Sequence, residues 1–183
     1  MRYNGAWRGQ GADAVDRVLS FSVLSLVLLA PAAFAQVSPQ DRAWLVVAHQ
    51  TNLAEIEAGT LAAQSGHAES VRNAGRMLVD EHRALDAKLQ PVAKQLGVKL
   101  PDHPDAQQKA EMQRFQRESG MQFDRTWAQI EGDGHVLAIE LTVKETLQGS
   151  SPQVKQLATE ALPVLRRHLE VLRQASVRIT GSG

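Results

Sequence analysis

Three histidines stand in or beside apolar helical stripes of this sequence. His82 and His168 each replace an apolar residue in a run with steps of three and four, and His135 lies one position from such a run. Glu55 lies on or beside the stripe of an earlier segment. Neutral imidazole binds zinc, iron or copper, and one carboxylate offsets part of the charge of the cation. These four residues are therefore candidate ligands of a divalent transition metal.

The four candidates are expected at similar heights along their helices. Glu55 and His82 flank the first predicted turn at comparable distances in sequence, as His135 and His168 flank the last one. Because a helix rises about 1.5 Å per residue, their side chains should fall within about two turns of one another. Helical bundles build metal sites from side chains on facing helices. The spacing thus favours one central layer of histidine and glutamate.

A buried polar network without a metal is the alternative for the same layer. A buried histidine needs a hydrogen-bond partner, such as a carboxylate or a backbone carbonyl, but it does not need a cation. Asp124 and Glu131 share a helical face with His135 and are expected to accept hydrogen bonds near it. Glu81 is expected on solvated helix surface, as a partner for nearby arginines. The remaining histidines show no cluster of ligating residues: His49, His67 and His103.

The segments that carry these residues have the period of amphipathic helices. Ser38, Pro39 and Asp41 form a helix start, with serine as the N-cap and an acidic residue three positions later. Helices are expected at about residues 39–64, 68–97, 105–118, between the stops at 120 and 149, and from 152 onward. Four long helices with short turns and one longer middle connection predict an all-α, antiparallel four-helix bundle with one short extra helix.

The third long helix has a less regular apolar pattern than the others. Its expected inward stripe consists of Phe123, Trp127, Ile130, Gly134, Leu137 and Leu141. Gly132 and Gly134 weaken the helix by about 1 kcal/mol each relative to alanine. They are expected either to bend the helix or to let a neighbouring segment approach closely.

The composition excludes several functional classes. Lysine plus arginine equals aspartate plus glutamate, at 20 each, so no basic nucleic-acid-binding surface is expected. The chain has no cysteine and only 4% aromatic residues, and the mature part is expected to be one domain held by its core. We find no phosphate-binding glycine loop and no nucleophile elbow, and we assign no catalytic residue. The sequence points to no partner and leaves homo-oligomerisation open.

The first 35 residues have the pattern of a secretory signal peptide. Arginines precede an apolar run at 18–30, and the segment ends in Ala33-Phe34-Ala35, a small-x-small cleavage pattern. The run is shorter than the roughly 20 residues that a membrane span requires. Cleavage after Ala35 would leave a mature domain at 36–183 without a transmembrane span. We therefore expect an exported protein of the periplasm or cell envelope.

The chain resembles an exported bacterial family catalogued as domain of unknown function 4142 and labelled "predicted outer membrane protein". The resemblance spans about residues 38–175. It rests on Glu55-Ile56, Gly59, Leu61-Ala62, Glu81-His82 where the family usually has Asp-His, Phe123-Asp124, His135, Leu162-Pro163, Leu165 and His168-Leu169. The resemblance implies a ferritin-like helical fold in the cell envelope, and it implies no established reaction.

Two functions from different classes are compatible with these observations. The first is a non-enzymatic, stress-related envelope protein whose central histidine layer is structural or binds a metal ion. The second is a metal-dependent redox enzyme of ferritin-like type. Ferritin-like di-iron proteins carry a Glu-x-x-His motif on each of two helices, and this sequence has none, so conventional ferroxidase activity is not expected.

Overall fold

A computed structural model describes residues 37–181, which form five helices and no strand. The helices are α1 (Pro39–Ser65), α2 (Glu69–Gln95), α3 (Ala106–Phe115), α4 (Gly120–Gln148) and α5 (Pro152–Gly181). The predicted all-α fold is confirmed, including the short extra helix in the middle connection. The predicted signal peptide and its cleavage site lie outside the described residues.

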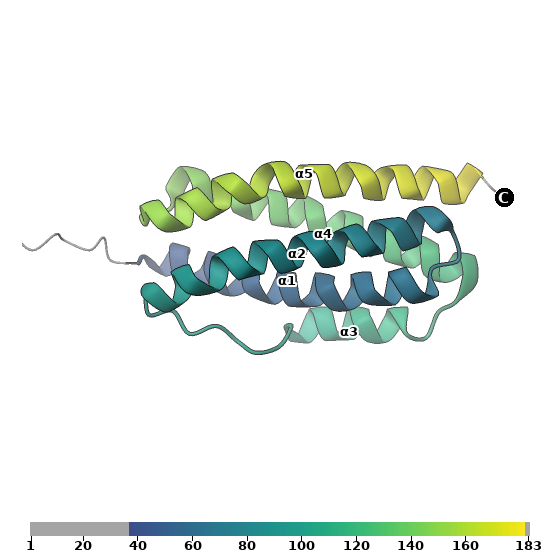
Figure 1. The fold of residues 1–183 in the computed structure, drawn as a ribbon, viewed down its shortest axis with the longest axis horizontal. Coiled ribbons are helices and arrows are strands. Elements are labelled where there is room, and N and C mark those ends of the chain that lie inside the picture. The colour runs from purple at the N-terminus through teal and green to yellow at the C-terminus, as the bar shows by residue number, and fades with distance from the viewer. Residues whose placement is uncertain (1–36, 182–183) are drawn as a thin grey trace, which may run out of the picture. The chain divides into compact units, whose positions relative to one another are not determined.

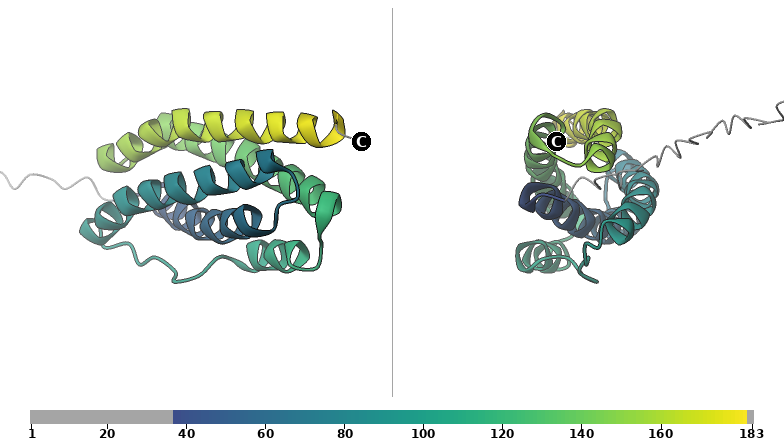
Figure 2. Two further views of the ribbon diagram at one scale, coloured as in Figure 1. Left: turned by 45° about the vertical axis from the view of Figure 1, so that its right-hand side comes forward. Right: turned by 90° about the vertical axis from the view of Figure 1, so that its left-hand side faces the viewer.

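The four long helices pack as an antiparallel bundle (Figure 1). α1 packs along α2 and α4 packs along α5, while the α2–α5 and α1–α4 contacts close the bundle. The connection from α2 to α4 returns along the bundle through α3, which packs outside α1 and α4, as Figure 2 shows. One such crossover connection is the topology of ferritin-like bundles. None of the helices within 37–181 is both long and apolar enough to cross a membrane.

Asp41 ties the start of α1 to the turn between α4 and α5. Ser38 and Asp41 form the predicted capping box, in which each side chain accepts the backbone N–H of the other residue. The Asp41 carboxylate also accepts the backbone N–H groups of Ser150 and Ser151, at 2.9 and 3.1 Å. Burial acts to raise the pKa of Asp41, but hydrogen bonds from Ser150 and Ser38 hold this pKa well below its usual range. This carboxylate therefore fixes the relative position of two helix pairs at one end of the bundle.

The apolar core consists of two clusters with polar side chains buried between them. One cluster includes Leu78, Phe123, Trp127 and Leu172, and the other includes Trp44, Leu45, Leu89 and Val154. At the height between the two clusters, the buried residues of α1, α2 and α4 are largely polar, whereas on α5 His168 is buried beside the apolar Ala161 and Leu165. The polar residues are Asn52 and Glu55 on α1, His82 and Asp86 on α2, Glu131 and His135 on α4, and His168 on α5. The bundle thus contains a central polar layer, as the spacing of the histidines predicts.

The predicted inward stripe of α4 is wrong in its second half. Leu137 and Leu141 are 55% and 37% exposed, whereas Glu131 and His135 are buried. The helix turns its polar face toward the bundle interior at this height and its leucines toward a cavity. The hydrophobic period of α4 therefore does not mark its buried face.

The close helix approach lies between α1 and α2, not at the glycines of α4. A Cβ atom added to Gly59 would lie 2.8 Å from the carbonyl oxygen of Gly75, and one added to Gly75 would lie 2.6 Å from that of Gly59. By contrast, an added Cβ at Gly132 or Gly134 meets no atom within 4 Å. The backbones of α1 and α2 therefore touch one turn beyond Glu55, and this contact sets the spacing of the two helices beside the polar layer.

Candidate metal centre

Three buried imidazole rings from three helices converge in the polar layer. The ring centroids of His82 and His168 lie 5.0 Å apart, those of His135 and His168 5.3 Å, and those of His82 and His135 5.6 Å. One ring nitrogen of each histidine lies within 4.8 Å of those of the other two. All three side chains are fully shielded from solvent.

The His82 ring is oriented by the side-chain amide of Asn52, whose oxygen accepts a hydrogen bond from the ring. Nδ1 of His82 lies 2.9 Å from Oδ1 of Asn52, whose Nδ2 donates to Oδ1 of Asp86 at 3.3 Å. Since a carboxylate only accepts hydrogen bonds, the Asn52 amide must turn its oxygen toward His82. His82 therefore donates from Nδ1, and its Nε2 carries a lone pair. This Nε2 is buried and has no hydrogen-bond partner.

Asp86 accepts hydrogen bonds from both Asn52 and His49, a histidine around which no cluster of ligating residues was expected. Asp86 accepts hydrogen bonds from Nδ1 of His49 at 2.6 Å and from Gln90 at 2.6 Å, besides the one from Asn52. The other nitrogen of His49 lies 2.9 Å from the carbonyl oxygen of Pro101. His49 pairs with Asp86, one helix turn beyond His82 on α2, but among the described residues it belongs to no group of three potential metal ligands, which agrees with the expectation.

The His135 and His168 rings are each fixed by an acceptor on one nitrogen. Nδ1 of His135 donates to the carbonyl oxygen of Glu131 at 2.8 Å. Nε2 of His168 donates to the carboxylate of Glu81 at 2.8 Å, and Glu81 also pairs with Arg167. The expected arginine partner of Glu81 is present, but this carboxylate is also part of the polar layer. The remaining nitrogens, Nε2 of His135 and Nδ1 of His168, face each other at 3.2 Å.

The environment of the three rings favours their neutral forms. Burial lowers the pKa of His82, aided by His135 and His168, and burial also lowers the pKa of His135. Burial lowers the pKa of His168 to about 4, despite its hydrogen bond with Glu81. Each ring therefore has its single N–H directed to a fixed acceptor and a lone pair directed toward the other rings. Neutral imidazole in this tautomeric state is the form that binds metal ions.

Glu55 lies in a second group, with Glu131 and His135, rather than with all three histidines. One oxygen of Glu55 is 3.5 Å from Nδ1 of His135, and its Oε2 is buried without a partner. Burial raises the pKa of Glu55 to about 7, although its hydrogen bond with Glu131 acts in the opposite direction. Burial and the charge of Glu55 raise the pKa of Glu131 well above its usual range. Both carboxyl groups therefore keep their protons to a higher pH than an exposed glutamate does.

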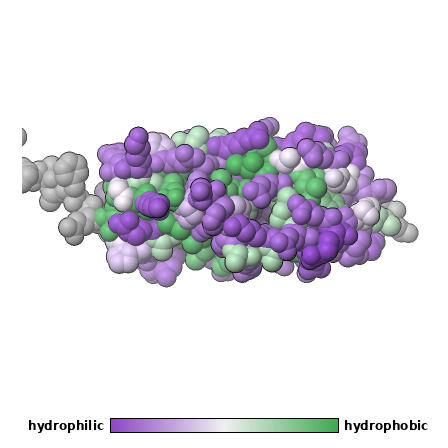
Figure 3. Space-filling view, turned by 90° about the horizontal axis from the view of Figure 1, so that it is seen from below, coloured by the Kyte–Doolittle hydropathy of each residue, from purple (hydrophilic) through white to green (hydrophobic). Residues whose placement is uncertain are grey.

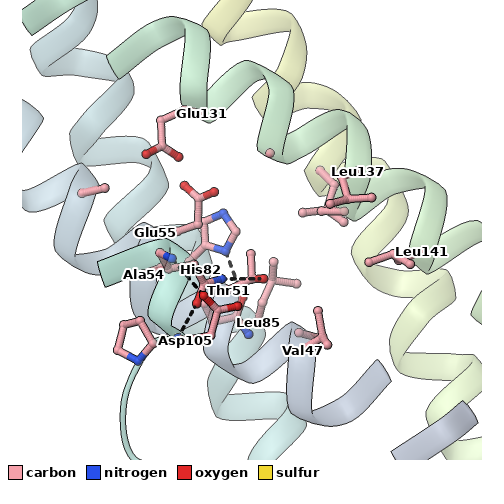
Figure 4. Close-up of a pocket in the computed structure, with 18 of the residues that line it drawn as sticks. Val47, Thr51, Ala54, Glu55, His82, Leu85, Asp105, Glu131, Leu137 and Leu141 are labelled. Atoms are coloured by element: carbon pink, nitrogen blue, oxygen red, sulfur yellow. Dashed lines mark hydrogen bonds between the residues drawn. The ribbon is translucent and has the colours of Figure 1, made fainter. Parts of the chain in front are cut away.

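A cavity of about 440 Å³ reaches this layer from the side where α1, α3 and α4 meet. Glu55, His82 and Glu131 line its inner part, and Figure 4 shows the two carboxyl groups facing each other near the His82 ring. Val47, Leu137 and Leu141 line its outer part. The polar layer is thus accessible through a cavity with partly apolar walls.

Of the four residues predicted as ligands, the structure brings His82, His135 and His168 together and places Glu55 in a second group with Glu131 and His135. The prediction for Glu131 near His135 agrees with the structure, but that for Asp124 is wrong. The Asp124 carboxylate accepts the backbone N–H groups of His67 and Ala68 and thereby caps the start of α2.

The fold and the site together define a class: an all-α bundle whose interior holds a cluster of buried histidine and glutamate side chains that could hold a metal ion. Residues 27–175 match the model of a family described as "Domain of unknown function (DUF4142)". The chain belongs to this family, as its motifs predict. No curated protein and no solved structure matches the chain.

Proposed function

We propose that this protein binds one divalent transition-metal ion through His82, His135 and His168. The main support is the 3.2 Å contact between Nε2 of His135 and Nδ1 of His168. With each N–H committed to another acceptor, this contact brings two lone pairs together, and the unpartnered Nε2 of His82 adds a third. A cation among the three nitrogens would convert this repulsion into coordination.

The donor set favours zinc, iron or copper, because imidazole suits all three metals. The partners of the rings resemble those of known metal-bound histidines, in which the second nitrogen donates to a carboxylate, a carbonyl or a similar acceptor. In this arrangement a carboxylate oxygen of Glu55 lies 3.5 Å from Nδ1 of His135, the ring nitrogen that does not bind the metal ion, and Glu55 supplies negative charge beside the centre.

We further propose that the protein acts in the cell envelope after export, as a metal-binding rather than a catalytic protein. The N-terminal segment with its Ala33-Phe34-Ala35 pattern supports export. A metal-dependent redox enzyme is the second candidate, and one observation favours it. The cavity between α1 and α4 reaches His82, so a small molecule has a route to the proposed metal ion.

The metal content of the purified protein tests this proposal. We expect close to one zinc, iron or copper ion per chain in protein prepared without chelator and without a metal-affinity step. A chelator at pH 7 should lower the melting temperature, because a metal that binds only the folded state stabilises it. Near-stoichiometric iron or copper would favour the redox enzyme, and zinc would favour the non-enzymatic function.

His82→Leu should abolish stoichiometric binding, whereas His103→Leu, in an exposed connection, should leave it unchanged. Protein that contains no metal, takes up none of the three ions when they are added, and melts at the same temperature with and without chelator would overturn the proposal.

A further inference from the structure

The cavity between α1 and α4 differs in charge from the rest of the protein. The chain as a whole carries equal numbers of acidic and basic residues. Seven of the residues that line the cavity are aspartate or glutamate, and one is lysine. That lysine, Lys88, is already paired with Glu160 at 3.1 Å. The cavity is therefore strongly acidic, and a cation is the complementary ligand.

The inner end of the cavity holds a buried acceptor without a partner. Oε2 of Glu55 makes no hydrogen bond, and the Glu55 side chain is only 7% exposed. Figure 4 shows Glu55 and Glu131 directed toward each other in this part of the cavity. An unpaired buried carboxylate oxygen costs free energy, and a ligand with N–H donors would remove that cost.

The walls nearer to solvent are apolar. Val47, Leu137 and Leu141 line the cavity although all three are at least one-third exposed. In Figure 4 they lie apart from the carboxyl pair, on α1 and α4. Figure 3 shows the face that carries α3, where hydrophobic residues are exposed among hydrophilic ones. A hydrated metal ion would leave such walls without a partner, whereas an alkyl chain would cover them.

We propose that this cavity binds a primary alkylamine in its ammonium form, with the ammonium group at Glu55 and Glu131 and the alkyl chain along Val47, Leu137 and Leu141. A primary ammonium group is a compact charge with three donors, which suits two adjacent carboxyl groups. The cavity volume of about 440 Å³ lies within the usual range of ligand pockets, roughly 300–1,000 Å³. The amine site adjoins the proposed metal centre, since Glu55 lies 3.5 Å from His135, but it requires no metal ion.

Calorimetric titration with n-octylamine tests the proposal, with the purified protein held in chelator so that no metal takes part. Octanol and octanoate carry the same chain with a neutral and an anionic head group. We expect saturable binding of one octylamine per chain, with binding of octanol and octanoate at least tenfold weaker. Butylamine should also bind more weakly than octylamine, because it covers less of the apolar wall.

Two kinds of variant locate the site. Glu55→Gln and Glu131→Gln should each weaken octylamine binding at least tenfold, whereas Glu69→Gln, on exposed surface outside the cavity, should not. Leu137→Ser alters only a half-exposed wall residue, so it should fold normally and weaken binding several-fold. His168→Leu, which removes a proposed metal ligand that does not line the cavity, should still bind octylamine.

Equal affinity for octylamine and octanol would overturn the proposal, as would full binding by both Glu55→Gln and Leu137→Ser or no octylamine binding at all. Since the titration is done without metal, each of these outcomes leaves the proposed metal centre untouched. Conversely, protein that takes up no zinc, iron or copper but binds octylamine would contradict only the metal centre.

Discussion

Nε2 of His135 lies 3.2 Å from Nδ1 of His168, although neither nitrogen carries the hydrogen that such a contact requires. The N–H of His135 is directed to the carbonyl oxygen of Glu131, and that of His168 to the carboxylate of Glu81. Both acceptors lie on the far side of their rings from the contact. The 3.2 Å contact therefore depends on the acceptors that orient the two rings. Substitution of residues that orient the histidine rings tests the site as directly as substitution of the histidines.

Asn52→Leu tests the group that holds His82. This variant removes the acceptor of the His82 N–H, so the ring can turn and its lone pair is no longer directed toward the other two rings. Loss of such a partner typically weakens metal binding by about 10–100-fold. We expect a loss of this size in competition with a chromogenic chelator. Asn73→Leu, on exposed surface of the same bundle, is the control and should bind metal as the wild type does.

The same experiment also has an informative negative result. If Asn52→Leu folds and binds the metal ion with wild-type affinity, then the Asn52 amide does not orient His82 for coordination. The link from Asp86 through Asn52 would then serve stability alone.

The central layer could be predicted from the sequence because His82 and His168 interrupt apolar stripes that are otherwise regular. Their position along the helices then follows from residue counts and helical rise. The face of α4 could not be predicted in this way. Leu137 and Leu141 line a cavity while Glu131 and His135 are buried, so hydrophobicity and burial disagree on this helix.

Partners contributed by distant segments were also beyond a single-sequence reading. His49 meets Asp86 across 37 positions, and Asp124 reaches the start of α2 across more than 50. Both contacts depend on how far one helix is shifted along its neighbour. The apolar period of a helix predicts its inward face, except on α4, but it carries no information about that shift.

His168→Leu should change how stability depends on pH in metal-free protein. Burial lowers the pKa of His168 to about 4, and in the unfolded chain it is near 6.5. As the pH falls from about 6.5 to 4, the unfolded state takes up a proton that the folded state does not. The free energy of unfolding contributed by this group therefore falls with falling pH, by about 1.4 kcal/mol per pH unit.

Urea denaturation at several pH values, with chelator present, measures this slope. His168→Leu should lack the contribution of that histidine, and Glu81 keeps Arg167 as its partner in the variant. Asn73→Leu, on exposed surface, removes no titratable group and should keep the wild-type slope. Identical slopes for wild type and His168→Leu would mean that His168 takes up its proton at the same pH in the folded protein as in the unfolded chain.

Glu55 should make stability depend on pH in the opposite direction to His168, and Glu55→Gln should remove this dependence. Burial raises the pKa of Glu55 to about 7. The folded protein therefore keeps a proton that the unfolded chain releases above about pH 4.5, and this contribution to stability is lost as the pH rises from about 4.5 to 7. Glutamine stays neutral throughout, so the variant should gain stability relative to wild type over this range, by up to about 1.4 kcal/mol per pH unit.

Denaturation of metal-free wild type and Glu55→Gln at pH 4.5 and pH 7 is sufficient to measure this change. Asn73→Leu, on exposed surface, removes no titratable group and is the control that should show no pH-dependent difference. A stability difference between Glu55→Gln and wild type that is the same at both pH values would show that Glu55 titrates in the folded protein as it does in the unfolded chain.

Gly59→Ala should destabilise the bundle, whereas Gly132→Ala should stabilise it. The new methyl group at Gly59 would lie 2.8 Å from the backbone oxygen of Gly75, which cannot rotate away as a side chain would, so α1 and α2 must separate. Overpacking of this kind typically costs about 1–3 kcal/mol. At Gly132 the methyl group meets no atom within 4 Å, and alanine is favoured over glycine in a helix by up to about 1 kcal/mol.

Separation of α1 from α2 should also disturb the polar layer, because the hydrogen bond between Asn52 on α1 and His82 on α2 spans the two helices. Gly59→Ala is therefore expected to weaken metal binding and to lower the free energy of unfolding. Gly132→Ala should raise the free energy of unfolding and leave metal binding unchanged. Urea denaturation and chelator competition on the same two variants check both effects. Loss of stability in Gly59→Ala with unchanged metal affinity would show that the His82 ring keeps its orientation when the α1–α2 spacing changes.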